Sequence, residues 1–157
     1  GWLDVAWRYM ASEGLVEDSC YPYTSGDGGK SGECHSSCTG SGDWKKYHAT
    51  GVHQVGKNQE AIKADVEQHG PAEVAFTVYE DFMNYKSGVY HHVSGRMLGG
   101  HAVKLMGWGN EGGNDYWLIA NSWGTTWGDK GCFKIKRGNN ECGIEGDVVS
   151  GLAGKHD

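Results

Sequence analysis

The sequence has little proline and no long apolar run. Two prolines occur among 157 residues, and no segment approaches the ~20 apolar residues of a membrane span. The first residues lack the basic start and apolar core of a secretory signal peptide. The net charge is −6, and there are no clusters of Lys and Arg of the kind that neutralise phosphates. We therefore expect a soluble chain, processed or cut at its start, that binds neither nucleic acid nor a membrane.

The glycine, tryptophan and cysteine contents indicate a loop-rich globular fold. The 27 glycines and seven tryptophans are typical of tight turns bracketed by large aromatic side chains. A length of 157 residues suits one domain, or equally half of a larger two-lobed enzyme. Because five cysteines are an odd number, at least one is a free thiol or bonds to a cysteine outside this chain.

Helices are predicted in the first half of the chain. Apolar residues at helical spacing predict a helix over residues 2–13, with Gly14 as its stop. Asn58 can cap a second helix, which ends at Gly70-Pro71.

The remaining segments divide into an irregular loop and a run of strands. The loop spans about 20–47, is rich in Gly and Ser, and holds three cysteines that predict disulfide bonding. The expected strands are 72–78, 101–107, 116–120, 132–136 and 144–150, with a short turn of helix near 81–85. Helices followed by strands on short connections predict an α+β fold with an antiparallel sheet.

Two short motifs carry candidate catalytic residues. They are Gly99-Gly100-His101-Ala102 and, twenty residues later, Asn121-Ser122-Trp123-Gly124. His101 is the candidate base, because the unperturbed pKa of histidine lies near neutrality, and beside a thiol it would hold a thiolate–imidazolium pair. Asn121 would accept a hydrogen bond from the far ring nitrogen, and Trp123 with Trp127 would shield that contact from water. No neighbouring cysteine completes the pair.

Motifs along nearly the whole chain extend this pattern. The chain resembles papain-family cysteine proteases, and within that family the cathepsin B-like enzymes. The residues that carry the resemblance, besides the two motifs above, are Gly14-Leu15-Val16, Cys20-Tyr21-Pro22-Tyr23, His69-Gly70-Pro71, Tyr79-Glu80-Asp81-Phe82, Tyr85-Lys86-Ser87-Gly88-Val89-Tyr90, Gly107-Trp108-Gly109, Tyr116-Trp117-Leu118, Trp127-Gly128 and Cys142-Gly143-Ile144-Glu145.

The resemblance implies a two-lobed papain-like fold of which this chain, 1–157, is the C-terminal portion. Residues 1–50 would supply a helix and the disulfide loop region, and residues 51–157 mostly the β-barrel lobe with His101. The family's nucleophile lies roughly 130–150 residues before its histidine, about 30–50 positions before Gly1. We therefore expect the cysteine on an N-terminal, light-chain-like segment, and this chain alone to be inactive. No cofactor is implied.

The resemblance also implies roles for the cysteines. Cys20 and Cys38 match a family bridge across the base of the loop, and Cys34 matches a cysteine whose partner lies in the N-terminal segment. Cys142 matches a position that is typically buried and free, and Cys132 is either a small hydrophobe or a partner of Cys142. A zinc site between Cys34 and Cys38 lacks four ligands at recognised spacing, so no metal is expected.

Substrate contacts are likewise implied by the resemblance. The positions that match the second specificity pocket are Ala75, Gly100, Ala102 and Asp147, and Trp123 would also contact substrate. Asp147 replaces a glutamate at the base of that pocket and would favour Arg or Lys at the second position before the cut. The alternative is that Asp147 is a solvated acid after a strand.

The segment that gives cathepsin B-like enzymes exopeptidase activity is short here. The family's occluding loop carries paired histidines, whereas the span from Cys20 to Cys38 holds only His35. His91 and His92 lie elsewhere and are interpreted as exposed. We therefore expect an open, endopeptidase-like cleft.

Two classes of function stay open. The first is an active cysteine endopeptidase of peptides and proteins, lysosomal, vacuolar or secreted, with cystatin-like inhibitors among its candidate partners. The second is a protease-like binding or matrix protein that has lost catalysis, and an isolated fragment is a further alternative. Retention of both His101 and Asn121 favours the enzyme.

Overall fold

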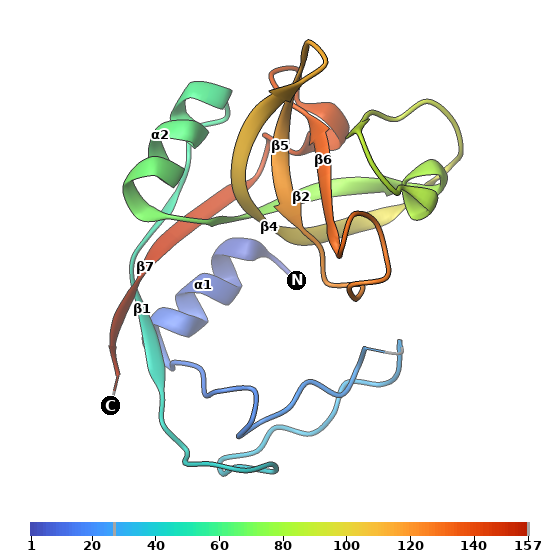
Figure 1. Ribbon diagram of the computed structural model, residues 1–157. Coiled ribbons are helices and arrows are strands. Elements are labelled where there is room, and N and C mark those ends of the chain that lie inside the picture. The colour runs from blue at the N-terminus through green and yellow to red at the C-terminus, as the bar shows by residue number, and fades with distance from the viewer. Residues whose placement is uncertain (27, 157) are drawn as a thin grey trace.

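The computed structural model describes residues 1–26 and 28–156 as one sheet with two α-helices beside it (Figure 1). The helices are α1 (Leu3–Ser12) and α2 (Gln59–His69), with the short 3-10 helices η1 (Glu80–Asn84) and η2 (Glu141–Gly143). The strands are β1 (Tyr47–Gln54), β2 (Ala72–Tyr79), β3 (Val89–Tyr90), β4 (Met97–Glu111), β5 (Asn114–Ala120), β6 (Cys132–Lys136) and β7 (Val148–His156). In this part of the chain the strand order is β1-β7-β2-β4-β5-β6-β3, and all neighbours are antiparallel except β3 and β6. The predicted α+β class is confirmed.

Both predicted helices form, and local signals set their ends. Gly14 follows α1 with a φ of +78°, a conformation that favours glycine. The Asn58 side chain accepts a hydrogen bond from Ala61 N at 2.9 Å, and Gly70 ends α2 with a φ of +89°. No helix of the described chain has the length and apolar character needed to cross a bilayer.

The strands that pair in the middle of the sheet also lie where the pattern predicts them. In β2 every second residue is buried, beginning with Ala72, and β6 has the predicted bounds. β4 is longer than the predicted 101–107, because it continues into a hairpin with β5. The β2–β4 register sets Phe76 opposite His101 and Ala75 opposite Ala102.

The last predicted strand, 144–150, is wrong at its start. Ile144 has helical backbone angles, φ −60° and ψ −25°, and follows η2. Glu145 N donates to the Asn140 side chain at 2.9 Å, so this buried segment is a closed turn, and β7 begins only at Val148. Ile144 and Glu145 are both buried, so an apolar residue next to Val148 and Val149 resembles a continuous strand when it is read from sequence alone.

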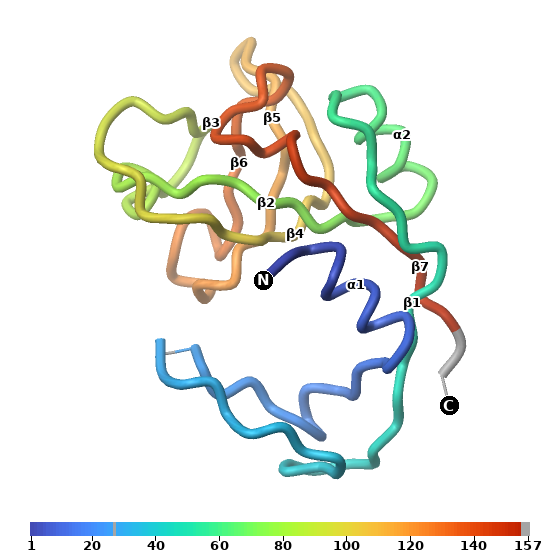
Figure 2. Tube along the Cα trace, turned by 180° about the vertical axis from the view of Figure 1, so that it is seen from behind, coloured from blue at the N-terminus to red at the C-terminus, as the bar shows by residue number. Residues whose placement is uncertain are grey.

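Strand β1 was not predicted, because its residues do not alternate. It pairs within the sheet only with β7, with register shifts on both sides of Ala49 and Thr50, and Gly51 has a φ of +61°. An irregular edge strand exposes residues on both faces and loses the period of two. The segment between α1 and β1 runs away from the sheet, as Figure 1 and Figure 2 both show.

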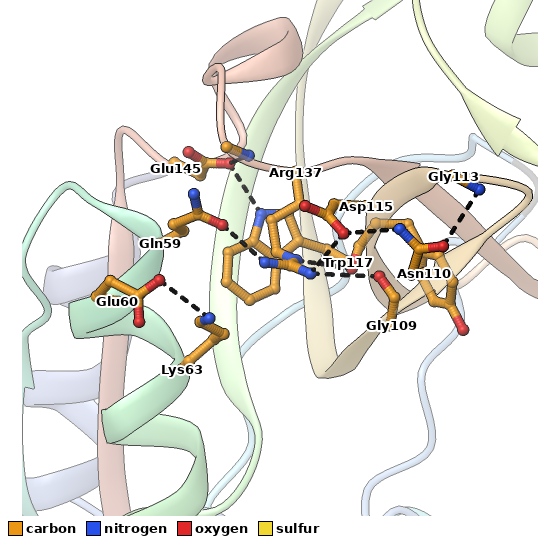
Figure 3. Close-up of polar contacts among 12 residues, drawn as sticks. Gln59, Glu60, Lys63, Gly109, Asn110, Gly113, Asp115, Trp117, Arg137 and Glu145 are labelled. Atoms are coloured by element: carbon orange, nitrogen blue, oxygen red, sulfur yellow. Dashed lines mark hydrogen bonds and ion pairs between the residues drawn. The ribbon is translucent and has the colours of Figure 1, made fainter.

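A buried polar network holds the turn after β6 against the β4–β5 hairpin and α2 (Figure 3). Trp117 is fully buried and donates through Nε1 to Glu145 at 3.0 Å. Arg137 lies over the Trp117 ring and donates to Gln59 at 2.7 Å and to the carbonyl of Gly109 at 3.3 Å. These contacts join three segments that are far apart in the sequence.

Candidate active site

His101 and Asn121 come together where β4 and β5 lie side by side. His101 is within β4, and Asn121 follows the last residue of β5. The distance from His101 Nε2 to Asn121 Oδ1 is 2.8 Å. The same amide oxygen accepts from Ser122 N at 2.8 Å, and the Asn121 backbone N–H donates to Gly131 O at 3.0 Å. Two donors at Oδ1 define which way the amide faces, and therefore place a hydrogen on Nε2 of His101.

The other ring nitrogen of His101 has no hydrogen-bond partner among the described residues. With Nε2 donating to Asn121, the Nδ1 atom of the neutral ring presents a lone pair. A lone pair of this kind accepts a proton from an acidic group such as a thiol. The geometry therefore suits His101 to act as a base on the side away from Asn121.

Aromatic rings enclose the His101–Asn121 pair. Trp123 stacks on the His101 ring at a centroid distance of 5.1 Å and an interplanar angle of 18°, and the Phe76 ring lies 5.9 Å from it. Trp127 contacts Trp123 edge-on at 5.1 Å, and its Nε1 donates to Met83 O at 3.2 Å. Trp123 therefore packs on the His101 ring, and Trp127 packs on Trp123.

Two surface hollows adjoin the pair. One, of about 260 Å³, is lined by Val78, Met83, Leu98, Gly99, Gly100, His101 and Trp123. The other, of about 610 Å³, lies between α1 and the sheet and is lined by residues that include Trp7, Met10, Glu73, Ala102 and Asn121. Each contains one member of the pair, so a chain bound across the site would have a hollow on either side.

The predicted substrate residues divide between these hollows and their surroundings. Gly100 lines the smaller hollow and Ala102 the larger one. Ala75 lies opposite Ala102 in the sheet, and its backbone N–H donates to Asp147 O at 3.2 Å. Ala75 therefore stands between Ala102 on one side and Asp147 on the other, and neither Ala75 nor Asp147 lines either hollow.

Glu73 is a residue of the larger hollow that sequence reasoning missed. Its Oε2 accepts a hydrogen bond from Trp7 Nε1 at 2.8 Å. Burial, together with the charge of Asp147, raises the pKa of Glu73. The alternation of β2 places Glu73 on the same face as Ala75, which is the signal that could have identified it. The carboxyl groups of Glu73 and Asp147 are therefore close enough to interact electrostatically.

His92 corrects the expectation that both His91 and His92 are exposed. His91 is exposed, but the His92 ring stacks on Tyr79 at 3.7 Å, and its Nδ1 lies 3.1 Å from Asp81 Oδ1. Asp81 also accepts from Tyr90 Oη at 2.7 Å and from Val93 N at 2.9 Å. Burial acts to raise the pKa of Asp81, but these hydrogen bonds bring it well below its usual range. Asp81 thereby anchors the loop that leads to the smaller hollow.

The cysteines lie in different environments. Cys20 and Cys38 form a disulfide, and Cys34 is a free, exposed thiol. Cys132 and Cys142 are both free, so the pairing considered for them does not occur, and burial raises the pKa of the Cys142 thiol to about 12. Because Cys38 is in a disulfide, it is unavailable to a metal.

A histidine in contact with an asparagine and a tryptophan, where the central strands β4 and β5 meet, has the geometry that a thiol hydrolase needs for two of its three catalytic groups. A family model described as papain family cysteine protease matches residues 1–152. The chain belongs to the papain family of cysteine proteases.

Individual relatives are cathepsin B-like. The chain is 46% identical to cathepsin B-like protease 1 of Arabidopsis thaliana, over 94% of this chain and 42% of the relative. It is 46% identical to cathepsin B-like CP3 of Giardia intestinalis, over 97% and 52%. The solved procathepsin B S9 of Trypanosoma congolense superposes with a TM-score of 0.86 at 38% identity, over 96% of this chain and 52% of that one. The chain thus spans about half the length of the relatives it matches.

Proposed function

We propose that His101 and Asn121 are the base and the orienting residue of a Cys-His-Asn peptidase site whose cysteine lies on a segment outside this chain. The observation that carries the proposal is the 2.8 Å contact between His101 Nε2 and Asn121 Oδ1 beneath the stacked Trp123 ring, with Nδ1 left without a partner. Membership of the papain family supports the same chemistry.

In this mechanism His101 holds and moves one proton. Its Nδ1 takes the proton of the thiol, which gives a thiolate–imidazolium pair. The thiolate attacks the substrate carbonyl, and the imidazolium then donates its proton to the leaving amine, after which water releases the acyl group. Asn121 keeps the ring in one orientation throughout. Its neutral amide suffices, because the imidazole is already charged.

The proposed activity is that of a cathepsin B-like endopeptidase. The short loop between Cys20 and Cys38 supports an open cleft, and His92, held by Asp81 and Tyr79, is committed to a structural contact. Peptides or proteins would be the substrates, and the partner segment would be light-chain-like, with cystatin-like inhibitors as further candidates.

Removal of the base tests the proposal. In the protein reconstituted with a cysteine-bearing N-terminal segment, His101→Ala should lower kcat/KM on a peptide substrate by about 10²–10⁴-fold. The matched control is His91→Ala, which removes an exposed histidine and should leave turnover unchanged. The 157-residue chain by itself should show no turnover that a thiol alkylator abolishes. Near-normal activity of His101→Ala would exclude His101 as the base.

Substrate selectivity is proposed to depend on Asp147, which follows Ala75 across the sheet from Ala102. Asp147→Ala should lower kcat/KM for Arg-Arg substrates by about tenfold or more and leave Phe-Arg substrates nearly unchanged. Glu73→Gln is the informative comparison, because the Glu73 carboxylate interacts electrostatically with Asp147 but accepts a hydrogen bond from Trp7. Equal losses on both substrates with Asp147→Ala would mean that Asp147 supports the fold and does not contact the substrate.

A further inference from the structure

A cluster of two histidines and one aspartate, separate from the His101–Asn121 pair, lies where α2 meets β1. Asp65 and His69 are four residues apart on α2 and therefore share one face. His53 reaches them from β1: its Nε2 contacts Asp65 Oδ2, and His69 Nδ1 lies 3.4 Å from the same oxygen. The ring centroids of His53 and His69 are 5.0 Å apart.

Three buried polar atoms around this cluster lack a hydrogen bond of full geometry. They are Asp65 Oδ1, His69 Nδ1 and Ser150 Oγ, and their nearest polar contacts are with one another's side chains, His69 with Asp65 and Ser150 with Asp65. Ser150 is fully buried and lies opposite His53 in the β1–β7 register, so all these atoms face one small region. A buried polar atom without a good hydrogen bond is unfavourable. An ion bound by Asp65 and His69 would use the lone pairs of these two side chains.

The orientation of His53 is set from outside the cluster. Its Nδ1 lies 2.6 Å from the carbonyl oxygen of Gly51, to which it donates. This contact directs Nε2 toward Asp65 and His69. Histidines that bind metals make such a hydrogen bond from the ring nitrogen that does not bind the ion.

We propose that His53, Asp65 and His69 form a zinc site whose fourth ligand is water. Their candidate ligand atoms all lie within 4.8 Å of one another. Zinc binds nitrogen and oxygen at about 2.0–2.2 Å, which sets tetrahedral ligands roughly 3.4 Å apart. The observed 3.4 Å between His69 and Asp65 matches this spacing. His53 Nε2 completes the set from β1, and the side chain is 34% exposed, so an ion can reach it from solvent.

The donor set favours zinc over magnesium or calcium. Imidazole nitrogens suit zinc, whereas the two harder ions prefer oxygen ligands throughout. Zinc bound by His53, Asp65 and His69 would join β1 to α2.

Zinc titration of the full protein tests the site. Accessible free thiols are alkylated first, so that thiolates such as that of Cys34 do not bind the ion. Calorimetry should then show one Zn²⁺ per chain, and the thermal midpoint should rise with zinc concentration. His69→Gln and Asp65→Asn should each weaken binding by at least about tenfold. The matched control His91→Gln should bind as the wild type does.

X-ray absorption on zinc-loaded wild type keeps the test independent of how the variants fold. A coordination shell of nitrogen and oxygen with two imidazoles supports the site. No zinc binding by the alkylated wild type, sulfur in the shell, fewer than two imidazoles, or unchanged affinity in folded His69→Gln would each overturn it.

Discussion

Residues up to Lys46 and residues from Tyr47 onward are stabilised in different ways. Among the described residues of the first region, the buried hydrophobic side chains are Leu3 and Cys20. The second region contains the entire hydrophobic core cluster, from Val55 to Val148. The first region therefore depends on a disulfide and on α1 contacting the sheet, whereas the second depends on close packing of its own side chains.

The two hollows beside the His101–Asn121 pair also differ in which of these regions lines them. The smaller one lies wholly on the packed region, next to His101. The larger one has α1 as one wall and the sheet as the other, and Trp7 of α1 donates to Glu73 of β2 across it. The candidate base His101 thus belongs to the closely packed region, whereas Ala102 and Glu73 line the hollow where the two regions meet.

The largest expected effect is from a core substitution in the second region. Phe82 is fully buried and contacts the rings of Phe76, Trp123 and Phe133, among others. Phe82→Ala should reduce the free energy of unfolding by about 3–5 kcal/mol, because it leaves a cavity among these rings. Urea unfolding followed by tryptophan fluorescence measures the change. A loss below about 1 kcal/mol would show that this region is not closely packed.

Removal of the disulfide should act on the first region alone. Cys20 and Cys38 are separated by 18 positions, and a loop of that size corresponds to about 3 kcal/mol of chain entropy. The double substitution Cys20→Ser, Cys38→Ser should expose residues 21–46 to limited proteolysis and leave the sheet protected. Cys34→Ser is the matched control and should change nothing in the digestion pattern. Equal protection with and without the disulfide would contradict the comparison.

Asp81 gives the packed region a pH-dependent contribution. Its pKa in the folded state is lowered, so its stabilisation is present above the unfolded value of about 3.9 and is lost as the pH falls through the folded value. Asp81→Asn should cost about 1.5–3 kcal/mol at pH 7 through the loss of charged hydrogen bonds. The difference from wild type should shrink at about pH 3 and below. Unfolding measured at several pH values gives the result, and a constant difference would contradict it.

The smallest effect should come from an aromatic residue of the first region. Tyr23 is 76% exposed, and Tyr23→Ala should change the free energy of unfolding by less than about 0.5 kcal/mol. The comparison with Phe82→Ala uses a similar loss of ring volume at a site of opposite burial. A large loss at Tyr23 would mean that the first region contains packing that its exposure does not reveal.

Local signals explain how much of the fold was predictable. The ends of α1 and α2 follow from Gly14, Asn58 and Gly70, each of which acts through neighbouring backbone. The strands β2 and β6 follow from alternation and from turn residues at their ends. β1 and the start of β7 were missed, because an edge strand and a buried turn do not follow the period of two.

The candidate site, like the fold, could be predicted from the sequence only in part. The motifs identify His101 and Asn121 as chemical types, and the structure brings them to 2.8 Å. Their catalytic roles, and those of Asp147 and Trp127, stay predictions. Glu73 and the contact of His92 with Asp81 were missed, because neither Glu73 nor His92 belongs to a recognisable motif.

The sequence by itself determined the family, the α+β class, the helix ends and which two residues, His101 and Asn121, are the catalytic candidates. These depend on residue type and on contacts within a few positions. Only the tertiary structure decided that Glu73 approaches Asp147 and that His53 of β1 meets Asp65 and His69 of α2. Such pairs depend on strand register and helix packing, which arise from many weak, long-range contacts together. No short stretch of residues encodes them.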